Sequence, residues 1–171
     1  MAVVGREGSR TVEFASVVRA WPRYDPAVTA SLDPAALREA RQKAGLTQGQ
    51  VARALGLAGG EAVSVWERGA FEPKSAALLH RLAEVLGATV PELLRCDDGS
   101  PDLRYLRLVA GLESADVADQ LHVAVSTYRR WERGAWTRSP SDAVVVSLAQ
   151  AFGVAPRAVA RALAHTQAHS E

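Results

Sequence analysis

Apolar residues along most of the chain recur every three or four positions, in short blocks that end near glycine or proline. In the clearest block Leu78, Leu79, Leu82 and Leu86 share one face, and Gly87 follows directly. This spacing is typical of an amphipathic helix that ends at glycine. No segment sustains a strict alternation of apolar and polar residues, so the pattern predicts an all-α chain without a sheet.

The blocks occur in two similar copies. The residues Trp-Glu-Arg-Gly-Ala stand at 66–70 and again at 131–135, and the matched apolar positions around them lie 65 or 66 residues apart. The first copy has one extra residue beside Gly59-Gly60, where a loop absorbs a change of length cheaply. A repeat of this period indicates that one small helical unit is present twice.

Capping residues and prolines place the ends of the expected helices. The expected starts are Asp33-Pro34, Pro73-Lys74, Ser100-Pro101 and Ser139-Pro140, with capping boxes at Thr47 and Gln50 and at Thr89 and Glu92. The expected helices cover 34–44, 48–55, 61–68, 73–86 and 89–94 in the first copy, and 101–110, 114–122, 125–133, 140–152 and 156–166 in the second.

The repeat also divides the chain into domains. Residues 1–33 have no counterpart in the repeat and are expected to form an N-terminal arm, with a short helix at Thr11–Trp21. The first unit then covers 34–95, a linker 96–100, and the second unit 101–168.

The composition excludes several classes of protein. Cys96 is the single cysteine among 171 residues, which excludes a disulfide framework and a cysteine-rich zinc site. No apolar run approaches the roughly 20 residues of a membrane span, and no leader of the secretory type opens the chain, so we expect a cytoplasmic protein without membrane contact. No catalytic set, phosphate-binding glycine loop or three-ligand metal site emerges, so we expect neither an enzyme nor a cofactor or metal. Because the formal net charge is only +1, any nucleic-acid footprint has to be a local patch.

Two short helices joined by a tight turn inside a five-helix unit form a helix-turn-helix pattern. It requires a small residue where the helices cross, a residue tolerant of positive φ in the turn, and an apolar residue that plugs the second helix into the core. The two copies supply these features as Ala52, Gly56 and Val63, and as Ala118, His122 and Tyr128. His122 departs from glycine at modest cost, because histidine tolerates positive φ better than most residues.

With these residues both units resemble the Cro/phage-repressor (XRE) helix-turn-helix family, over about 37–94 and 103–163. The matching segments are Leu-Thr-Gln at 46–48, Val51-Ala52, Leu55-Gly56 and Trp-Glu-Arg-Gly at 66–69, with Val117-Ala118, Leu121 and Trp-Glu-Arg-Gly at 131–134. The resemblance implies two tandem five-helix, lambda-repressor-like domains. It also implies a bacterial transcriptional regulator that binds double-stranded DNA in a sequence-specific way and is associated with the nucleoid.

The resemblance further implies which residues meet DNA, because the second helix of the motif lies in the major groove with its N-terminal residues against base edges. The implied readers are Glu61 and Ser64 in the first unit and Ser126, Thr127, Arg129 and Arg130 in the second. We expect Arg130 and Ser126 to read bases, since arginine can donate two hydrogen bonds to guanine, and Arg129 to be shared between base and backbone. The implied phosphate contacts are Gln48 and its repeat partner Ser114, with Arg68, Lys74, Arg133 and Arg138.

The two units are not equivalent in this respect. Glu61 would repel phosphates or accept from cytosine, and Gly59-Gly60 lengthens the turn before its helix. Two interpretations therefore stay open for the first unit: it reads bases, or it serves as a backbone clamp or packing partner.

The remaining residues of the repeated motif have structural interpretations. Trp66 and Trp131 are expected to be core residues rather than DNA contacts, and Glu67 and Glu132 are each expected to pair with an arginine of their own unit. The alternative function is a protein-interaction adaptor for RNA polymerase, a toxin or another regulator. Either way, a tandem chain could act as a monomer with two units or as a homodimer.

Overall fold

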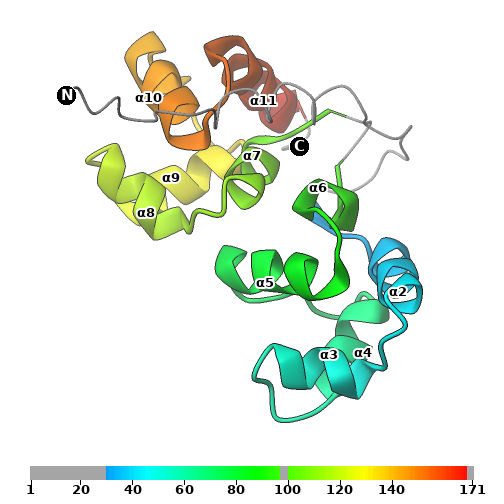
Figure 1. Cartoon of the computed structure of the whole chain (residues 1–171). Coiled ribbons are helices and arrows are strands. Elements are labelled where there is room, and N and C mark those ends of the chain that lie inside the picture. Colours follow the sequence, from blue (N-terminus) through cyan, green and yellow to red (C-terminus); the bar gives the residue numbers. More distant parts are fainter. Residues whose placement is uncertain (1–29, 97–99, 169–171) are drawn as a thin grey trace, which may run out of the picture.

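The computed structural model describes residues 30–96 and 100–168, which form ten helices and one pair of short strands (Figure 1). The helix expected at Thr11–Trp21 and most of the expected arm at 1–33 lie outside the described residues. The first unit, coloured blue to green in Figure 1, comprises β1 (Ser31–Leu32), α2 (Pro34–Lys43), α3 (Gln48–Ala54), α4 (Glu61–Glu67), α5 (Ala76–Leu86), α6 (Val90–Leu93) and β2 (Leu94–Arg95). The second, coloured yellow-green to red, comprises α7 (Leu103–Val109), α8 (Ser114–Gln120), α9 (Val125–Glu132), α10 (Asp142–Phe152) and α11 (Pro156–Ala168). The predicted architecture of two five-helix units is thus confirmed.

Several helices begin where their capping residues predict. The side chain of Asp33 accepts hydrogen bonds from the backbone N–H groups of Ala35 and Ala36, at 2.8 and 3.2 Å, and Pro34 is the first residue of α2. Thr47 and Gln50 form the expected capping box at the start of α3. Each cap satisfies N–H groups that a helix leaves without an intrahelical partner.

Three predicted helix starts are wrong, because each of these helices begins after a Ser or Asp that follows the proline in the sequence. Helix α5 begins after Ser75, whose Oγ accepts from the N–H of Leu78 at 3.1 Å, and not at Pro73-Lys74. Helix α7 begins after Asp102, whose carboxylate accepts from the N–H of Tyr105 at 2.6 Å, and not at Ser100-Pro101. Helix α10 begins at Asp142, after Ser141 in an extended conformation, and not at Ser139-Pro140.

The prediction that the chain has no sheet is also wrong. Strands β1 and β2 pair antiparallel, with Ser31 opposite Arg95 and Leu32 opposite Leu94. Two-residue strands are too short to show an alternating pattern in the sequence. Pairing them gives hydrogen-bond partners to backbone that is buried at the two ends of the first unit.

The two units bury the same repeat positions. Burial of each such side chain stabilises the fold by about 1.5–3 kcal/mol. The matched pairs with 0% exposure are Leu37 and Leu103, Val51 and Val117, Val63 and Tyr128, Leu82 and Leu148, and Leu93 and Val159.

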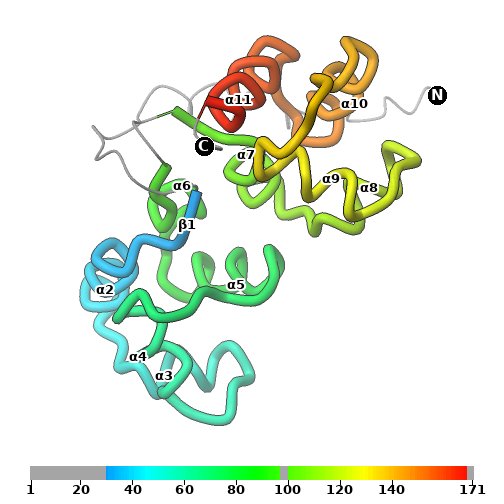
Figure 2. Tube along the Cα trace, turned by 180° about the vertical axis from the view of Figure 1, so that it is seen from behind, coloured from blue at the N-terminus to red at the C-terminus, as the bar shows by residue number. Residues whose placement is uncertain are grey.

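The two cores are continuous. Helices α5 and α6 lie beside α7 in both views (Figures 1 and 2), and the apolar cluster runs from Leu94 and Cys96 to Leu103 and Tyr105. The predicted linker at 96–100 therefore begins at a buried residue, and burial raises the pKa of the Cys96 thiol.

Within the described ranges no single helix is both long and apolar enough to cross a membrane. Helices α10 and α11 reach that length and composition only as a pair, and the chain bends by 109° between them.

Candidate nucleic-acid interface

The turn that joins the two helices of each motif has the predicted geometry. Gly56, between α3 and α4, has a φ of +73°, and His122, between α8 and α9, has a φ of 52°. Ala52 and Ala118 are buried where the paired helices cross. Val63 and Tyr128 are completely buried and anchor α4 and α9 in their cores, so these sequence predictions are confirmed.

The tryptophans of the repeated motif also pack as expected. Trp66 is buried, and Trp131 is half-buried against the core, with its ring edge-to-face with Tyr128 at a centroid distance of 6.4 Å.

The start of α4 lies close to the start of α3. A Cβ on Gly60 would lie 3.1 Å from the backbone nitrogen of Gly49 and 3.2 Å from the carbonyl carbon of Gln48. A Cβ on Gly59 would meet nothing within 4 Å. Of these two glycines, only Gly60 lies where a side chain would be crowded.

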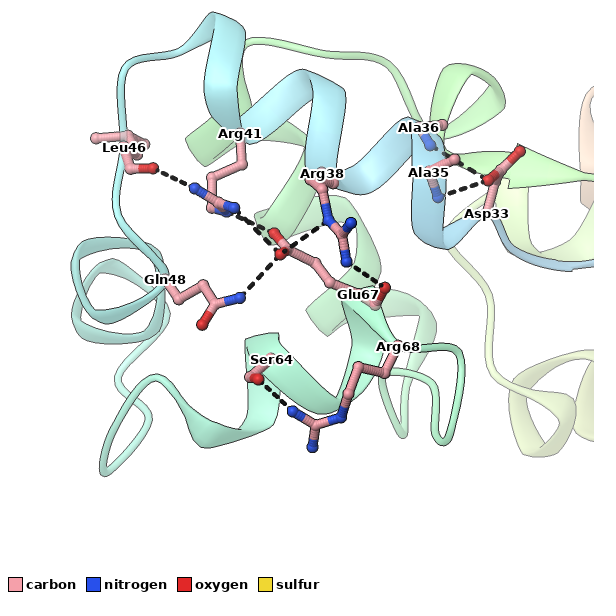
Figure 3. Close-up of polar contacts among 10 residues, drawn as sticks. All are labelled: Asp33, Ala35, Ala36, Arg38, Arg41, Leu46, Gln48, Ser64, Glu67 and Arg68. Carbon is pink, nitrogen blue, oxygen red and sulfur yellow. Dashed lines mark hydrogen bonds and ion pairs between the residues drawn. The ribbon is translucent and has the colours of Figure 1, made fainter.

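An ion pair holds α4 against α2 (Figure 3). Nε of Arg41 donates to Oε1 of Glu67 at 2.5 Å, and Nη1 donates to the carbonyl of Leu46 at 2.8 Å. The amide of Gln48 donates to Oε2 of Glu67 at 2.8 Å. Burial alone would raise the pKa of Glu67, but the hydrogen bonds from Arg41 and Gln48 outweigh it and the pKa is lowered. Glu67 is therefore a buried carboxylate that stays charged.

The second unit repeats this arrangement. Nε of Arg107 donates to Oε1 of Glu132 at 2.5 Å, and Nη1 donates to the carbonyl of Leu112 at 2.8 Å. The hydroxyl of Ser114 lies 3.5 Å from Oε2 of Glu132. The prediction that each glutamate pairs with an arginine of its own unit is confirmed. The structure thus places both expected phosphate contacts, Gln48 and Ser114, against these glutamates.

Helices α4 and α9 are the second helices of the two motifs, and we call them the recognition helices after the role that the resemblance implies. The outward residues of each form what we call its outer stripe. It consists of Glu61, Ser64, Val65 and Arg68 on α4 and of Ser126, Arg129, Arg130 and Arg133 on α9. On α4 the charged groups are close together: Nη1 of Arg68 donates to the hydroxyl of Ser64 at 2.5 Å, and Nη2 lies 3.4 Å from the carboxylate of Glu61 (Figure 3 shows the contact with Ser64). The formal charges on the outer stripe of α4 therefore sum to zero.

The outer stripe of α9 carries three arginines and no acid. Among the described residues, the guanidinium groups of Arg129 and Arg133 make no hydrogen bond or ion pair, and Nε of Arg130 donates only to the carbonyl of Ala135, at 3.3 Å. All three side chains are exposed. Ser126 is exposed at the start of the same stripe, and Thr127 beside it is half-buried.

Beside this stripe lies a depression of about 240 Å³, lined by Arg104, Arg107, Arg129, Glu132 and Arg133. Arg107 is paired with Glu132 and Arg104 with Glu72, so Arg129 and Arg133 give the depression its positive charge. Arg104 and Arg107 were not among the residues that the sequence predicted for this surface. Their offset of 66 residues from Arg38 and Arg41, which contact Glu67 in the first unit, is the signal that could have found them.

The last expected phosphate contacts, Lys74 and Arg138, are exposed in the loops that follow α4 and α9. Neither side chain has a hydrogen-bond or ion-pair partner within residues 30–96 and 100–168. Across the described part of the chain, no group of three or more His, Cys, Asp or Glu side chains is arranged to hold a metal ion.

Comparison with known proteins agrees with this geometry. Residues 35–95 match the family model described as "Helix-turn-helix domain", and residues 103–159 match the one described as "Helix-turn-helix". No curated protein and no solved structure matches the chain. The paired helices, their turns and these two matches coincide in both units. The chain therefore belongs to the Cro/phage-repressor (XRE) type helix-turn-helix family and is a DNA-binding protein with two such domains in tandem.

Proposed function

We propose that this protein is a bacterial, sequence-specific transcriptional regulator in which α9 reads bases in the major groove and the first unit holds the DNA backbone. The observation that carries the proposal is the difference between the outer stripes. Among the described residues, the guanidinium groups on the outer stripe of α9 make one hydrogen bond, from Arg130 to the carbonyl of Ala135, whereas Arg68 of α4 contacts Ser64 and Glu61.

The base contacts follow from the position of each side chain on α9. A recognition helix meets base edges with its N-terminal residues, where Ser126 is exposed. Arg130 lies one turn further along and is exposed, and its fork of donors matches O6 and N7 of guanine. Arg129 lies on the same stripe but also lines the depression, so it is shared between base and backbone.

The depression is the proposed binding site for a phosphate of the DNA backbone. Arg129 and Arg133 are the groups that bind it, because their guanidinium forks match a phosphate and have no competing partner among the described residues. Arg107 also lines the depression, but it does not bind the phosphate in this proposal, because its guanidinium already donates to Glu132. Ser114, Thr127 and Arg138 complete the backbone contacts of the second unit.

The first unit makes backbone contacts through Gln48, Arg68 and Lys74 in this proposal. Glu61 does not favour a phosphate, and in the major groove its carboxylate can accept only from the amino group of cytosine or adenine. Opening the solvent-exposed pair of Glu61 and Arg68 costs little, because such pairs contribute about 0–1 kcal/mol. Arg68 is therefore free to turn toward the DNA.

Selection of genomic fragments by the purified chain, followed by binding measurements on the enriched site, tests the proposal. Arg130→Ala should weaken specific binding by about 1–3 kcal/mol and relax the preference at one base pair. Arg157→Ala is the matched control, because Arg157 is exposed on α11 and has no side-chain partner in the described chain. Equal weakening by Arg130→Ala on every sequence would make it a phosphate contact, and no enriched site would refute sequence-specific binding.

One observation favours the second candidate function, a protein-interaction adaptor. Phe71 is 72% exposed in the loop after α4, beside the outer stripe whose charges cancel. A partner such as RNA polymerase could bury it. Salt dependence separates the two functions, because DNA binding through several phosphates weakens steeply with salt, whereas adaptor activity does not require DNA.

A further inference from the structure

Several polar contacts join the first unit to the second. The first joins the loop after α4 to α7. Oε2 of Glu72 accepts from Nη2 of Arg104 at 2.6 Å, while Oε1 of the same carboxylate accepts from the N–H of Leu32 at 3.2 Å. Glu72 thus ties the segment that follows one recognition helix to the first helix of the other unit.

The second contact joins α5 to the start of α8. Oε1 of Glu113 accepts from the N–H of Ala76 at 2.6 Å. Ala76 is the first residue of α5, so this N–H has no partner within its own helix. Glu113 directly precedes α8, and Asp116 accepts from its backbone N–H at 2.9 Å. A carboxylate of the second unit therefore caps a helix of the first unit.

The third contact lies one turn further along the same face of α5. Nε2 of His80 donates to the carbonyl of Leu108, at 2.9 Å. The same ring covers Gly111, where a Cβ would lie 3.3 Å from Nε2. A side chain at 111 would therefore crowd the ring of His80.

A fourth contact joins the segment that precedes β1 in the first unit to the second unit. The buried carboxylate of Asp102 accepts from the N–H of Ala30 at 2.9 Å, in addition to capping α7. Three of the four contacts come from residues 72–80 and the fourth from Ala30, so two separate segments of the first unit are held against the second and oppose bending about the connection. The continuous apolar core adds to the same restraint.

We propose that this contact surface fixes the placement of α9 relative to α4, and so sets the single separation along the duplex at which both units bind. Glu72, His80 and Glu113 are then specificity-determining residues that touch no DNA. The inference rests on the proposed function. Flexibly tethered units would accept a range of separations, whereas units held in one orientation accept one.

The test compares the wild-type chain with the triple variant E72A/H80A/E113A. The control is E39A/E84A, because both glutamates are exposed and have no side-chain partner among the described residues. Circular dichroism first establishes that each variant is folded. Residual dipolar couplings of the backbone amides, measured without DNA, then show whether one alignment tensor describes both units. Hydroxyl-radical footprinting on the selected DNA measures the separation of the protected backbone stretches.

We expect one alignment tensor and two protected stretches at a fixed separation for the wild type and for E39A/E84A. The triple variant should need two tensors and keep the stretch of the second unit. It should lose or blur the stretch of the first, with an affinity about tenfold lower because the first unit is no longer held in place. Two tensors for the wild type, or a triple variant indistinguishable from it, would overturn the inference. Failure of the proposed function looks different: no variant protects any DNA, while the couplings are unaffected.

Discussion

The two recognition helices, α4 and α9, stand on the same scaffold and present different surfaces. Beneath each, an arginine binds both a glutamate of the recognition helix and a backbone carbonyl. On the outside, Arg68 of α4 faces Glu61, whereas the matching Arg133 of α9 has no acid beside it on the stripe. The residues that position the helix are thus shared by the two copies, and the exposed residues that we propose to meet DNA are not. A role assigned to one unit therefore does not transfer to the other by alignment.

The largest expected effect comes from removing the glutamate beneath either helix. Glu132→Ala should destabilise the fold by about 3–5 kcal/mol, because it leaves the buried Arg107 without its partner. Glu67→Ala leaves Arg41, which is only half-buried, without its partner. The loss should be greater for Glu132. Arg107 is more buried than Arg41, with 8% against 15% of its side chain exposed, and Glu132 is the one acid lining a depression with four arginines. Denaturant unfolding, combined with hydrogen exchange of the backbone amides, measures the loss of stability in each unit.

The matched control is Glu39→Ala, an exposed glutamate on α2, which should change the free energy of unfolding by less than about 0.5 kcal/mol. Added phosphate should restore part of the stability of Glu132→Ala and none of that of Glu67→Ala, because it can screen the arginines of the depression. Equal losses that phosphate does not affect would contradict the difference between the units.

The next effect concerns DNA affinity. Giving α9 the residues of α4 at two stripe positions, with Arg129→Ser and Arg130→Val, removes the proposed base contacts. Specific binding should fall by about 1–3 kcal/mol for each base that the helix no longer reads. The slope of log affinity against log salt should also become shallower by about 0.9 for each phosphate that the helix no longer binds. Fluorescence anisotropy over a series of salt concentrations measures both quantities.

The reverse exchange on α4 is the complementary experiment. Ser64→Arg with Val65→Arg should steepen the salt dependence of non-specific binding, because it adds two cations to a stripe of zero net charge. No change in salt dependence would mean that α4 does not face the duplex. The first unit would then be only a packing partner.

A smaller effect separates the two glycines before α4. Gly60→Ala should destabilise the first unit by about 1–3 kcal/mol, because the new Cβ lies 3.1 Å from a backbone nitrogen that cannot move independently of α3. Gly59→Ala, with open space around it, should be nearly neutral. Thermal unfolding of the two variants tests this, and equal effects would show that α3 and α4 can separate at no cost.

The sequence sufficed for features that depend on local chemistry. The caps at Asp33 and Thr47 and the positive φ at Gly56 involve neighbours within a few residues, so they could be predicted. The cap of α7 could not, because Ser100 and Asp102 are both acceptable locally. What favours Asp102 is its second hydrogen bond, from the N–H of Ala30, which lies 72 residues away in the sequence.

The candidate site shows the same division. The repeat offset identifies Arg38 and Arg104 as equivalent positions, but it does not say where each side chain goes. Arg38 turns to Glu67 of its own unit, whereas Arg104 turns to Glu72 of the other unit. That choice depends on how the two units pack, which no pattern within one unit contains.

The smallest expected effect lies in the turn between the helices, where the two units differ by one residue. Gly56 has a φ of +73°, and His122 occupies the same turn at 52°, a region that costs an L-residue roughly 1–2 kcal/mol. His122→Gly removes that strain but adds freedom to the unfolded chain, which costs about 0.5–1 kcal/mol. The second unit should therefore gain about 0.5 kcal/mol in stability, with DNA affinity unchanged.

The complementary variant is Gly56→Ala, which should lower the free energy of unfolding of the first unit by about 1 kcal/mol, since its Cβ has space but its backbone is strained. Hydrogen exchange of the core amides in each unit can measure both changes. A loss of stability in His122→Gly would mean that the imidazole makes contacts in solution that outweigh the strain of its backbone.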